Sequence, residues 1–289
     1  MGNMIRGISE NGGVIFCGVD STEMVRTMEQ IHKTSAVTSA ALGRLITAAS
    51  IMGIMLKNSK DSVTLRVKGS GPAGTVLAVA DGLGCVKGYV ENPVVEIPLR
   101  EDGKLNVGAA VGRDGTLSVV RDLGLREPYV GQIPLVSGEI AEDITSYYAI
   151  SEQIPTVCAL GVLVAPDLTI ACAGGYLLQL LPGATEEEIS MLERNIAKVP
   201  SVTSLLEEGK TMEDIMNMVM DGFDPQILDE YDVNYRCDCS QERVERALLS
   251  MGKAELEQLQ KEEPVVEVNC QFCDKKYHID LQKLLDGIE

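Results

Sequence analysis

The sequence predicts an α+β protein with a large N-terminal α+β domain of antiparallel-rich sheets, a helical linker and a small C-terminal domain. Three observations support this prediction. Short segments that alternate apolar and polar residues, separated by glycine-rich turns, fill much of the N-terminal part. An acidic, methionine-rich stretch follows them, and four cysteines lie in two tight pairs near the C-terminus. We expect the domains to span residues 1–178, 179–234 and 235–289.

Composition excludes several classes of partner. The chain has 289 residues, of which 45% are hydrophobic, so it can bury a sizeable core. Aromatic residues make up 4% and tryptophan is absent, so the core depends on aliphatic side chains and methionine. The formal net charge of -18 argues against nucleic acid and against an anionic membrane surface, because both bind through clustered lysine and arginine.

The first predicted elements are two short strands within residues 3–19, around a turn at residues 11–13. A helix follows from Ser21 to about residue 31. Residues 35–56 form the longest apolar stretch, which contains Arg44 and many small residues. These features predict a buried core helix and not a membrane span.

A β-rich region punctuated by glycine comes next. Residues 62–68 alternate valine or leucine with polar residues, as expected for a half-buried strand. The same pattern predicts further strands at residues 75–80, 85–90, 104–111, 116–120 and 132–136. A helix over residues 139–153 and a hairpin of residues 157–164 and 168–173 complete the N-terminal domain.

The linker is marked by its charge and its methionines. Between Thr185 and Asp232 there are thirteen acidic residues, three basic residues and five of the twelve methionines. Two helices are predicted, at residues 186–198 and 212–220. Their apolar faces are narrow and their acidic side chains repel one another, so we expect them to be stable only when docked. The segment is either an ordinary acidic linker or a metastable element that can detach and expose a methionine-rich surface.

The C-terminal domain is too small to build a large core. Ser240 is a suitable N-cap for a helix through residue 250, and a second helix is expected at residues 253–261. Strands are expected at residues 265–268 and 277–279. Fewer than sixty residues with few large apolar side chains predict a metal staple.

The candidate staple is a set of four cysteines in a C-x-C pair and a C-x-x-C pair: Cys237, Cys239, Cys270 and Cys273. Two such pairs supply the four thiolates of a closed tetrahedral zinc site. Structural zinc contributes about 10–16 kcal/mol, more than a core of this size provides. Four thiolates and one Zn²⁺ leave a net charge of about −2, which Arg236, Lys275 and Lys276 could offset.

The same thiolates are also candidates for a redox switch, because metal-bound thiolates react with peroxide or hypochlorous acid. Oxidation would eject the metal and form disulfides. Four cysteines allow three pairings. Pairing Cys237 with Cys239 and Cys270 with Cys273 closes the shortest loops and so has the lowest entropic cost, although a C-x-C disulfide is geometrically tight. A static zinc ribbon is the plain alternative. The remaining cysteines are isolated among mostly apolar neighbours and are interpreted as small buried hydrophobes: Cys17, Cys85, Cys158 and Cys172.

Motifs of common enzymes are absent from the sequence. There is no phosphate loop, no G-x-S-x-G elbow and no H-E-x-x-H, and the only histidines are His32 and His278. His278 could compete as a ligand, but with four cysteines present we expect it on a strand surface. Two alternatives remain: a thiol–disulfide oxidoreductase using Cys270 and Cys273, for which the sequence lacks a βαβ context, and a zinc-ribbon nucleic-acid binder, which the negative charge opposes. With no signal peptide, we expect a reducing, cytoplasmic location.

Several motifs in order resemble one family, the thirty-three-kilodalton heat-shock, redox-regulated molecular chaperones (33 kDa chaperonins). The C-terminal match consists of CDCS at residues 237–240 and CQFC at residues 270–273, with Tyr277 downstream. The N-terminal match consists of TSAALGR at 38–44, GSGP at 69–72, YVG at 129–131, SGEIAEDI at 137–144, SEQ at 151–153 and GGYLLQ at 174–179. The resemblance covers essentially the whole chain.

The resemblance implies an ATP-independent holdase and no enzymatic activity. In such proteins the reduced, zinc-bound form is inactive. Oxidation with mild heat forms the disulfides Cys237–Cys239 and Cys270–Cys273, releases zinc and unfolds the linker. The active form is expected to bind unfolding client proteins, to dimerise and to pass clients to ATP-dependent foldases.

Overall fold

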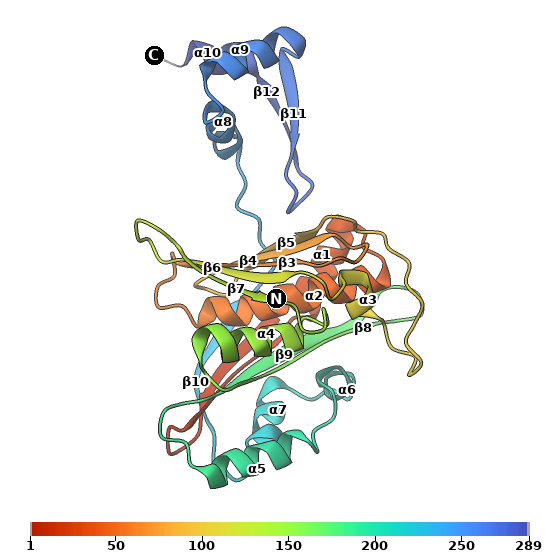
Figure 1. Cartoon of the computed structure of the whole chain (residues 1–289), viewed down its shortest axis with the longest axis vertical. Coiled ribbons are helices and arrows are strands. Elements are labelled where there is room, and N and C mark those ends of the chain that lie inside the picture. Colours follow the sequence, from red (N-terminus) through yellow and green to blue (C-terminus); the bar gives the residue numbers. More distant parts are fainter. Residues whose placement is uncertain (1, 288–289) are drawn as a thin grey trace. The chain divides into compact units, whose positions relative to one another are not determined.

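The computed structural model describes residues 2–287 (Figure 1). The chain divides into two compact units, with the boundary between Tyr235 and Arg236. The larger unit contains two five-stranded antiparallel sheets with their helices, and the smaller unit contains a two-stranded hairpin with three helices. The α+β class with antiparallel-rich sheets that the sequence predicts is confirmed.

The first sheet has the strand order β10-β1-β2-β9-β8, and all its neighbouring strands are antiparallel. Its strands are β1 (Gly2–Ile8), β2 (Val14–Asp20), β8 (Thr156–Val164), β9 (Ile170–Leu180) and β10 (Gln226–Val233). The N-terminal hairpin and the hairpin before residue 178 are therefore as predicted. The sequence did not predict β10, which brings the end of the acidic segment back beside β1.

The second sheet has the order β5-β4-β3-β6-β7. Its strands are β3 (Ser62–Lys68), β4 (Thr75–Asp81), β5 (Val86–Val90), β6 (Thr116–Asp122) and β7 (Tyr129–Pro134). The strand predicted at residues 104–111 is wrong, because α3 (Val107–Val111) forms there. The Asn106 side chain accepts a hydrogen bond from the Ala109 N–H at 3.1 Å and starts this short helix. An apolar run this short fits either a strand or a buried helical turn.

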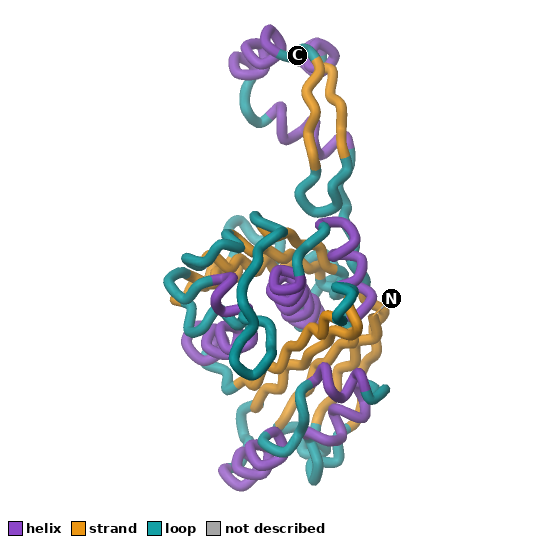
Figure 2. Tube along the Cα trace, turned by 90° about the vertical axis from the view of Figure 1, so that its right-hand side faces the viewer, coloured by secondary structure: helices purple, strands orange, loops and turns teal. Residues whose placement is uncertain are grey.

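Helix α2 (Ala36–Ile54) forms the core between the two sheets (Figures 1 and 2). It contacts β4 of one sheet and β8 and β9 of the other. Its length and hydropathy would suit a membrane span, but 94% of its most apolar 18-residue stretch is buried inside the protein. The predicted core helix is thus confirmed, and α1 (Thr22–His32) precedes it as expected.

The predicted helix at residues 139–153 is shorter and changes type. Helix α4 (Ala141–Tyr147) passes into one π-helical stretch, Tyr148–Glu152. Its start is fixed by the buried Asp143 carboxylate, which accepts backbone hydrogen bonds from Val136 and Ile140 at 2.7 and 3.0 Å. A carboxylate that accepts several N–H groups holds the preceding turn in one conformation.

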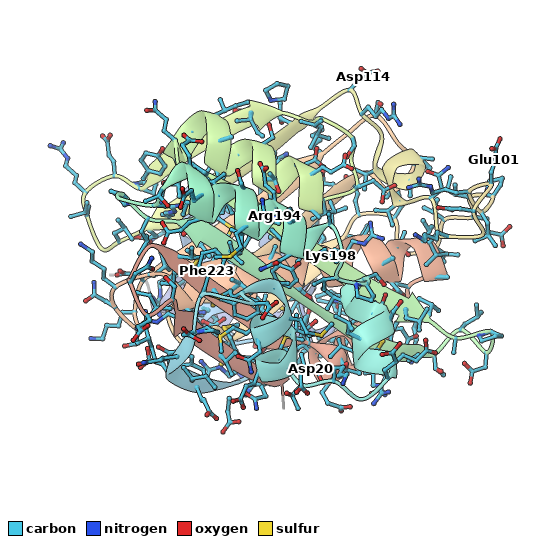
Figure 3. All side chains as sticks on the ribbon, turned by 90° about the horizontal axis from the view of Figure 1, so that it is seen from below. Asp20, Glu101, Asp114, Arg194, Lys198 and Phe223 are labelled. Carbon is cyan, nitrogen blue, oxygen red and sulfur yellow. The ribbon has the colours of Figure 1, made fainter. Side chains whose placement is uncertain are left out.

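Helices α5 (Glu186–Ile196), α6 (Val202–Glu207) and α7 (Met212–Val219) pack on the face of the first sheet that lies away from α2 (Figure 1). Figure 3 shows these helices from below, with Arg194 of α5 and Lys198 just after it labelled. The predicted helices correspond to α5 and α7. The sequence missed α6, which has six residues and only two buried side chains, Val202 and Leu205, so it carries little periodicity.

The smaller unit contains α8 (Gln241–Leu249), α9 (Lys253–Glu262), β11 (Val265–Asn269), β12 (Lys276–Asp280) and α10 (Leu281–Asp286). Four of these elements are as predicted, and α10 was not expected. As expected, Ser240 caps α8 by accepting a hydrogen bond from the Arg243 N–H at 3.3 Å. Among residues 236–287, the buried apolar core consists of five side chains: Leu256, Val266, Tyr277, Ile279 and Leu281.

Candidate metal centre and the segment that precedes it

The four cysteines of the smaller unit come together as one cluster. Their Sγ atoms all lie within 4.8 Å of one another. The Sγ atoms of Cys237 and Cys270 are 3.6 Å apart, and those of Cys239 and Cys273 are 3.4 Å apart. A tetrahedral zinc with Zn–S distances of about 2.3 Å holds its sulfurs about 3.8 Å apart. The number, type and spacing of these donors therefore fit a closed four-thiolate metal site.

Local backbone structure places each pair. Cys270 and Cys273 lie in the turn that joins β11 to β12. The Cys270 N–H donates to the Lys275 carbonyl at 2.9 Å, and the Asp274 N–H donates to the Cys270 carbonyl at 2.8 Å. This tight turn directs both thiols to one side. Cys237 and Cys239 lie in the extended stretch immediately before α8. The fold of α8 and α9 thus joins two pairs that are thirty residues apart in sequence.

Tyr277 also contacts the cluster. Its hydroxyl donates a hydrogen bond to Cys239 Sγ at 3.0 Å, and the Lys275 ammonium lies 5.1 Å from the centre of its ring. Burial raises the pKa of the Cys239 thiol, but hydrogen bonds from Tyr277 and from the other cysteines outweigh it and lower that pKa from 9.0 to about 7. Burial raises the pKa of Cys237. The sequence indicated Tyr277 only as part of a motif and gave no sign of this contact.

The other polar residues near the cysteines have different partners. Lys276 Nζ lies 2.9 Å from a carboxylate oxygen of Glu267 across the hairpin. His278 is exposed on β12, with Nε2 3.7 Å from Glu267, and it is not part of the metal-ligand cluster. The prediction that His278 lies on a strand surface is therefore confirmed. Because Lys276 forms an ion pair with Glu267, its charge is less available to offset the negative charge of the thiolates.

The isolated cysteines are packing residues. Cys17, Cys85 and Cys172 are buried, and Cys158 is half-buried. Burial raises the pKa of Cys17 to about 12 and that of Cys172 to about 11. Thiols with such high pKa values are poor nucleophiles at neutral pH. Their interpretation as small hydrophobes is confirmed for the three buried ones.

The acidic segment before the cysteines docks through methionine. Met212, Met216 and the neighbouring apolar residues of α7 are buried in a cluster with β1, β2 and β9. Glycines make room for them, since a Cβ built on Gly7 would lie 2.3 Å from Met216 Sδ. Likewise, a Cβ built on Gly174 would lie 2.7 Å from a methyl carbon of Leu206 in α6. We call this contact the linker interface: α5–α7 on the outer face of the first sheet.

The chain is also held just before Cys237. The Val86 N–H donates to the Asn234 carbonyl at 3.0 Å, and the Tyr235 hydroxyl donates to the Gly88 carbonyl at 2.8 Å. His32 Nε2 lies 3.1 Å from the same hydroxyl. Together with the pairing of β10 and β1, these bonds fix residues 226–235 on the larger unit. Sequence patterns did not indicate this anchor, because its contacts join residues far apart in the chain.

Comparisons with known proteins agree with this architecture. A profile of the Hsp33 protein family matches residues 2–280. The chain is 51% identical to a 33 kDa chaperonin of Clostridioides difficile over 98% of this chain and 97% of that protein. It is 47% identical to a 33 kDa chaperonin of Clostridium perfringens, covering 99% and 92% of the two chains.

A solved structure shares the whole fold. The crystal structure of the 33 kDa chaperonin (Hsp33) of Thermotoga maritima superposes with a TM-score of 0.88 at 37% identity, covering 98% of this chain and 97% of that chain. The chain belongs to the Hsp33 family of redox-regulated chaperones.

Proposed function

We propose that this chaperone is an ATP-independent holdase whose reduced form is kept inactive by one Zn²⁺ bound to Cys237, Cys239, Cys270 and Cys273. The observation that carries the proposal is the four-sulfur cluster, with all Sγ atoms within 4.8 Å, which follows in sequence a segment whose helices dock on the first sheet. We assign no catalytic residues. Its clients are unfolded or partly unfolded proteins of the cytoplasm.

Zinc would join two stretches of the smaller unit that are otherwise held together by a small core. When bound, it crosslinks the stretch before α8 to the β11–β12 turn and stabilises the unit by about 10–16 kcal/mol. The Tyr277 hydroxyl orients Cys239, and the turn at Cys270 fixes the second pair. A core of five buried side chains cannot replace that energy, so metal loss should unfold the unit.

Oxidation would convert the four thiols into two disulfides. Each disulfide takes two electrons from a pair of thiolates, and these electrons, with two protons from solvent, reduce one hydrogen peroxide to two waters. We propose the pairs Cys237–Cys239 and Cys270–Cys273. In the folded cluster the sulfurs of the crossed pairs Cys239–Cys273 and Cys237–Cys270 lie 3.4 and 3.6 Å apart. Once the metal leaves and the unit opens, loop-closure entropy favours nearest neighbours instead.

The regulated element in this proposal is the acidic segment. Residues 1–178 act as the chaperone core, residues 179–234 as the linker and residues 235–289 as the switch domain. Unfolding of the switch would free the chain up to the Tyr235 anchor, strain the pairing of β10 with β1 and allow α5–α7 to leave the first sheet. The released surface is proposed to bind clients, the active form to be a homodimer, and ATP-dependent foldases to receive the clients.

The experiment is aggregation of a thermally unfolding client, followed by light scattering, with reduced and with peroxide-treated protein. We expect suppression only after oxidation, with about one zinc released per chain. Peptide mapping of the oxidised protein checks the two disulfides. Equal suppression in both states with zinc retained would contradict the switch.

A further inference from the structure

We propose that the outer edge of β8 is a strand-addition site for extended, uncharged segments of unfolded client proteins. β8 is an edge strand of the first sheet and pairs only with β9. It has nine residues, TVCALGVLV, with neither a charged residue nor a proline. An edge strand presents a row of unpaired backbone groups that another chain can extend.

The register identifies the residues whose backbone groups point outward. The Leu180 N–H donates to the Pro155 carbonyl at 3.1 Å, and residue directions alternate in an antiparallel pair. Val157, Ala159 and Gly161 therefore bond to β9. Thr156, Cys158, Leu160 and Val162 direct their N–H and C=O groups away from the sheet. Within residues 2–287, no backbone hydrogen bond other than those to β9 joins these strand residues.

The other three edges of the two five-stranded sheets carry protecting features that are absent from the sequence of β8. β10 contains three acidic residues, and β5 contains Lys87 and is covered by the bond from Val86 to Asn234. β7 has six residues and ends at Pro134. Short length, charge, proline and coverage are the usual means by which edges avoid pairing. In β8 the single register shift lies between Leu163 and Val164, so the stretch before it remains regular.

Apolar layers flank this edge on both faces. Cys158, Leu160 and Val162 belong to the core around α2, whereas Val157 and Ala159 pack with the cluster beneath α5–α7. At Gly161, a built Cβ would lie 2.6 Å from the Thr203 methyl of α6. An added strand would thus place alternate side chains beside both layers. Release of α6, which rests on the proposed function, would open the second layer to larger side chains.

The lack of charge on β8 indicates which kind of chain would pair with it. Edge-to-edge pairing of two copies would use the same outward backbone groups, so it would make the protection of β8 depend on protein concentration. The edge itself is uncharged, so it accepts an apolar, extended segment without an electrostatic penalty. Unfolded clients of a chaperone present such segments, and strand addition reads mainly their backbone, which suits a binder of many sequences.

Amide exchange of the oxidised full-length protein, followed by NMR, tests the site. The probe is an uncharged ten-residue peptide of alternating valine and threonine. We expect the peptide to protect the amides of residues 158, 160 and 162, while those of 157, 159 and 161 are protected with or without it. The same peptide with N-methyl groups along one edge should bind at least about tenfold more weakly, since each backbone bond contributes about 1 kcal/mol.

A variant pair tests the same edge by function. Cys158→Pro removes one outward N–H without removing a bond to β9, and Cys158→Ala is the matched control. With both variants folded by circular dichroism, we expect only the proline variant to lose peptide affinity, by about tenfold. Suppression of client aggregation with no peptide-induced protection in β8 would overturn this site while leaving the holdase intact. Concentration-dependent protection of β8 without peptide would also overturn it, because the occupant would then be a second copy.

Discussion

Truncation of Met216 to alanine should loosen the linker interface without unfolding the core. Met216 is 1% exposed, and its sulfur fills the notch above Gly7. Removing a buried methionine side chain costs about 2–5 kcal/mol. If α5–α7 leave the sheet as one unit, the substitution lowers the free energy of that local opening by the full amount, about 2–5 kcal/mol. Because about 1.36 kcal/mol corresponds to a factor of ten, the open population should rise about 30-fold to 5,000-fold.

The assay is hydrogen exchange of the reduced, zinc-loaded protein, read by mass spectrometry. Exchange should accelerate in residues 186–219 and remain slow in β3 and β4. Met218→Ala is the matched control, because Met218 lies on the same helix but is 36% exposed. Its effect should stay within about 0.5 kcal/mol. Unchanged exchange in residues 186–219 for Met216→Ala, or an equal rise in β3 and β4, would refute local opening at this interface.

Three further predictions concern the same two sites. Gly7→Ala should accelerate amide exchange in α7, since the added Cβ would lie 2.3 Å from the buried Met216 sulfur. Gly13→Ala is the control and should have no such effect, because no atom lies closer than 3.4 Å to its added Cβ. Equal effects of the two substitutions would contradict a close fit of Met216 against Gly7. Tyr277→Phe removes the hydrogen bond to a metal ligand and should lower zinc affinity about 10-fold to 100-fold in a chelator competition; unchanged affinity would exclude that role. Backbone hydrogen bonds at the helix starts lower the pKa values of Glu188 and Asp214, whose usual values are 4.5 and 3.8. Their stabilisation is therefore complete above these values and lost as the pH falls through the lowered ones, so α5 and α7 should lose exchange protection in acid before β3 does.

Local sequence patterns predicted the helices and strands whose burial is regular along their length. Residues 62–68 alternate cleanly because one face of β3 is buried, and the helix at residues 36–54 has buried residues all around it because it lies between two sheets. The strand predicted at residues 104–111 failed because a five-residue apolar run does not distinguish a strand from a buried turn of helix. β10 escaped prediction because its acidic sequence is typical of a solvated segment, and only its pairing with β1 makes it a strand.

At the cysteine site, too, local sequence patterns predicted one part and tertiary contacts decided the rest. Cysteine spacing predicted the cluster, since two tight thiol pairs are the usual ligand set of a four-thiolate zinc site. Spacing carried no information on the hydrogen bond from Tyr277 to Cys239 or on the anchor at Tyr235, because these contacts depend on tertiary structure. The methionine-rich composition indicated an adaptable surface, but the glycine notches that receive Met216 and Leu206 come from sheet residues distant in sequence.

The central claim is that loss of the metal by oxidation releases the acidic segment while the core stays folded. The most direct measurement follows zinc release, free thiols and amide exchange together during peroxide treatment of the full chain. We expect one zinc and four thiols to be lost per chain, with exchange rising in residues 186–219 and remaining slow in β3 and β4. Complete zinc and thiol loss with residues 186–219 still protected would contradict the account.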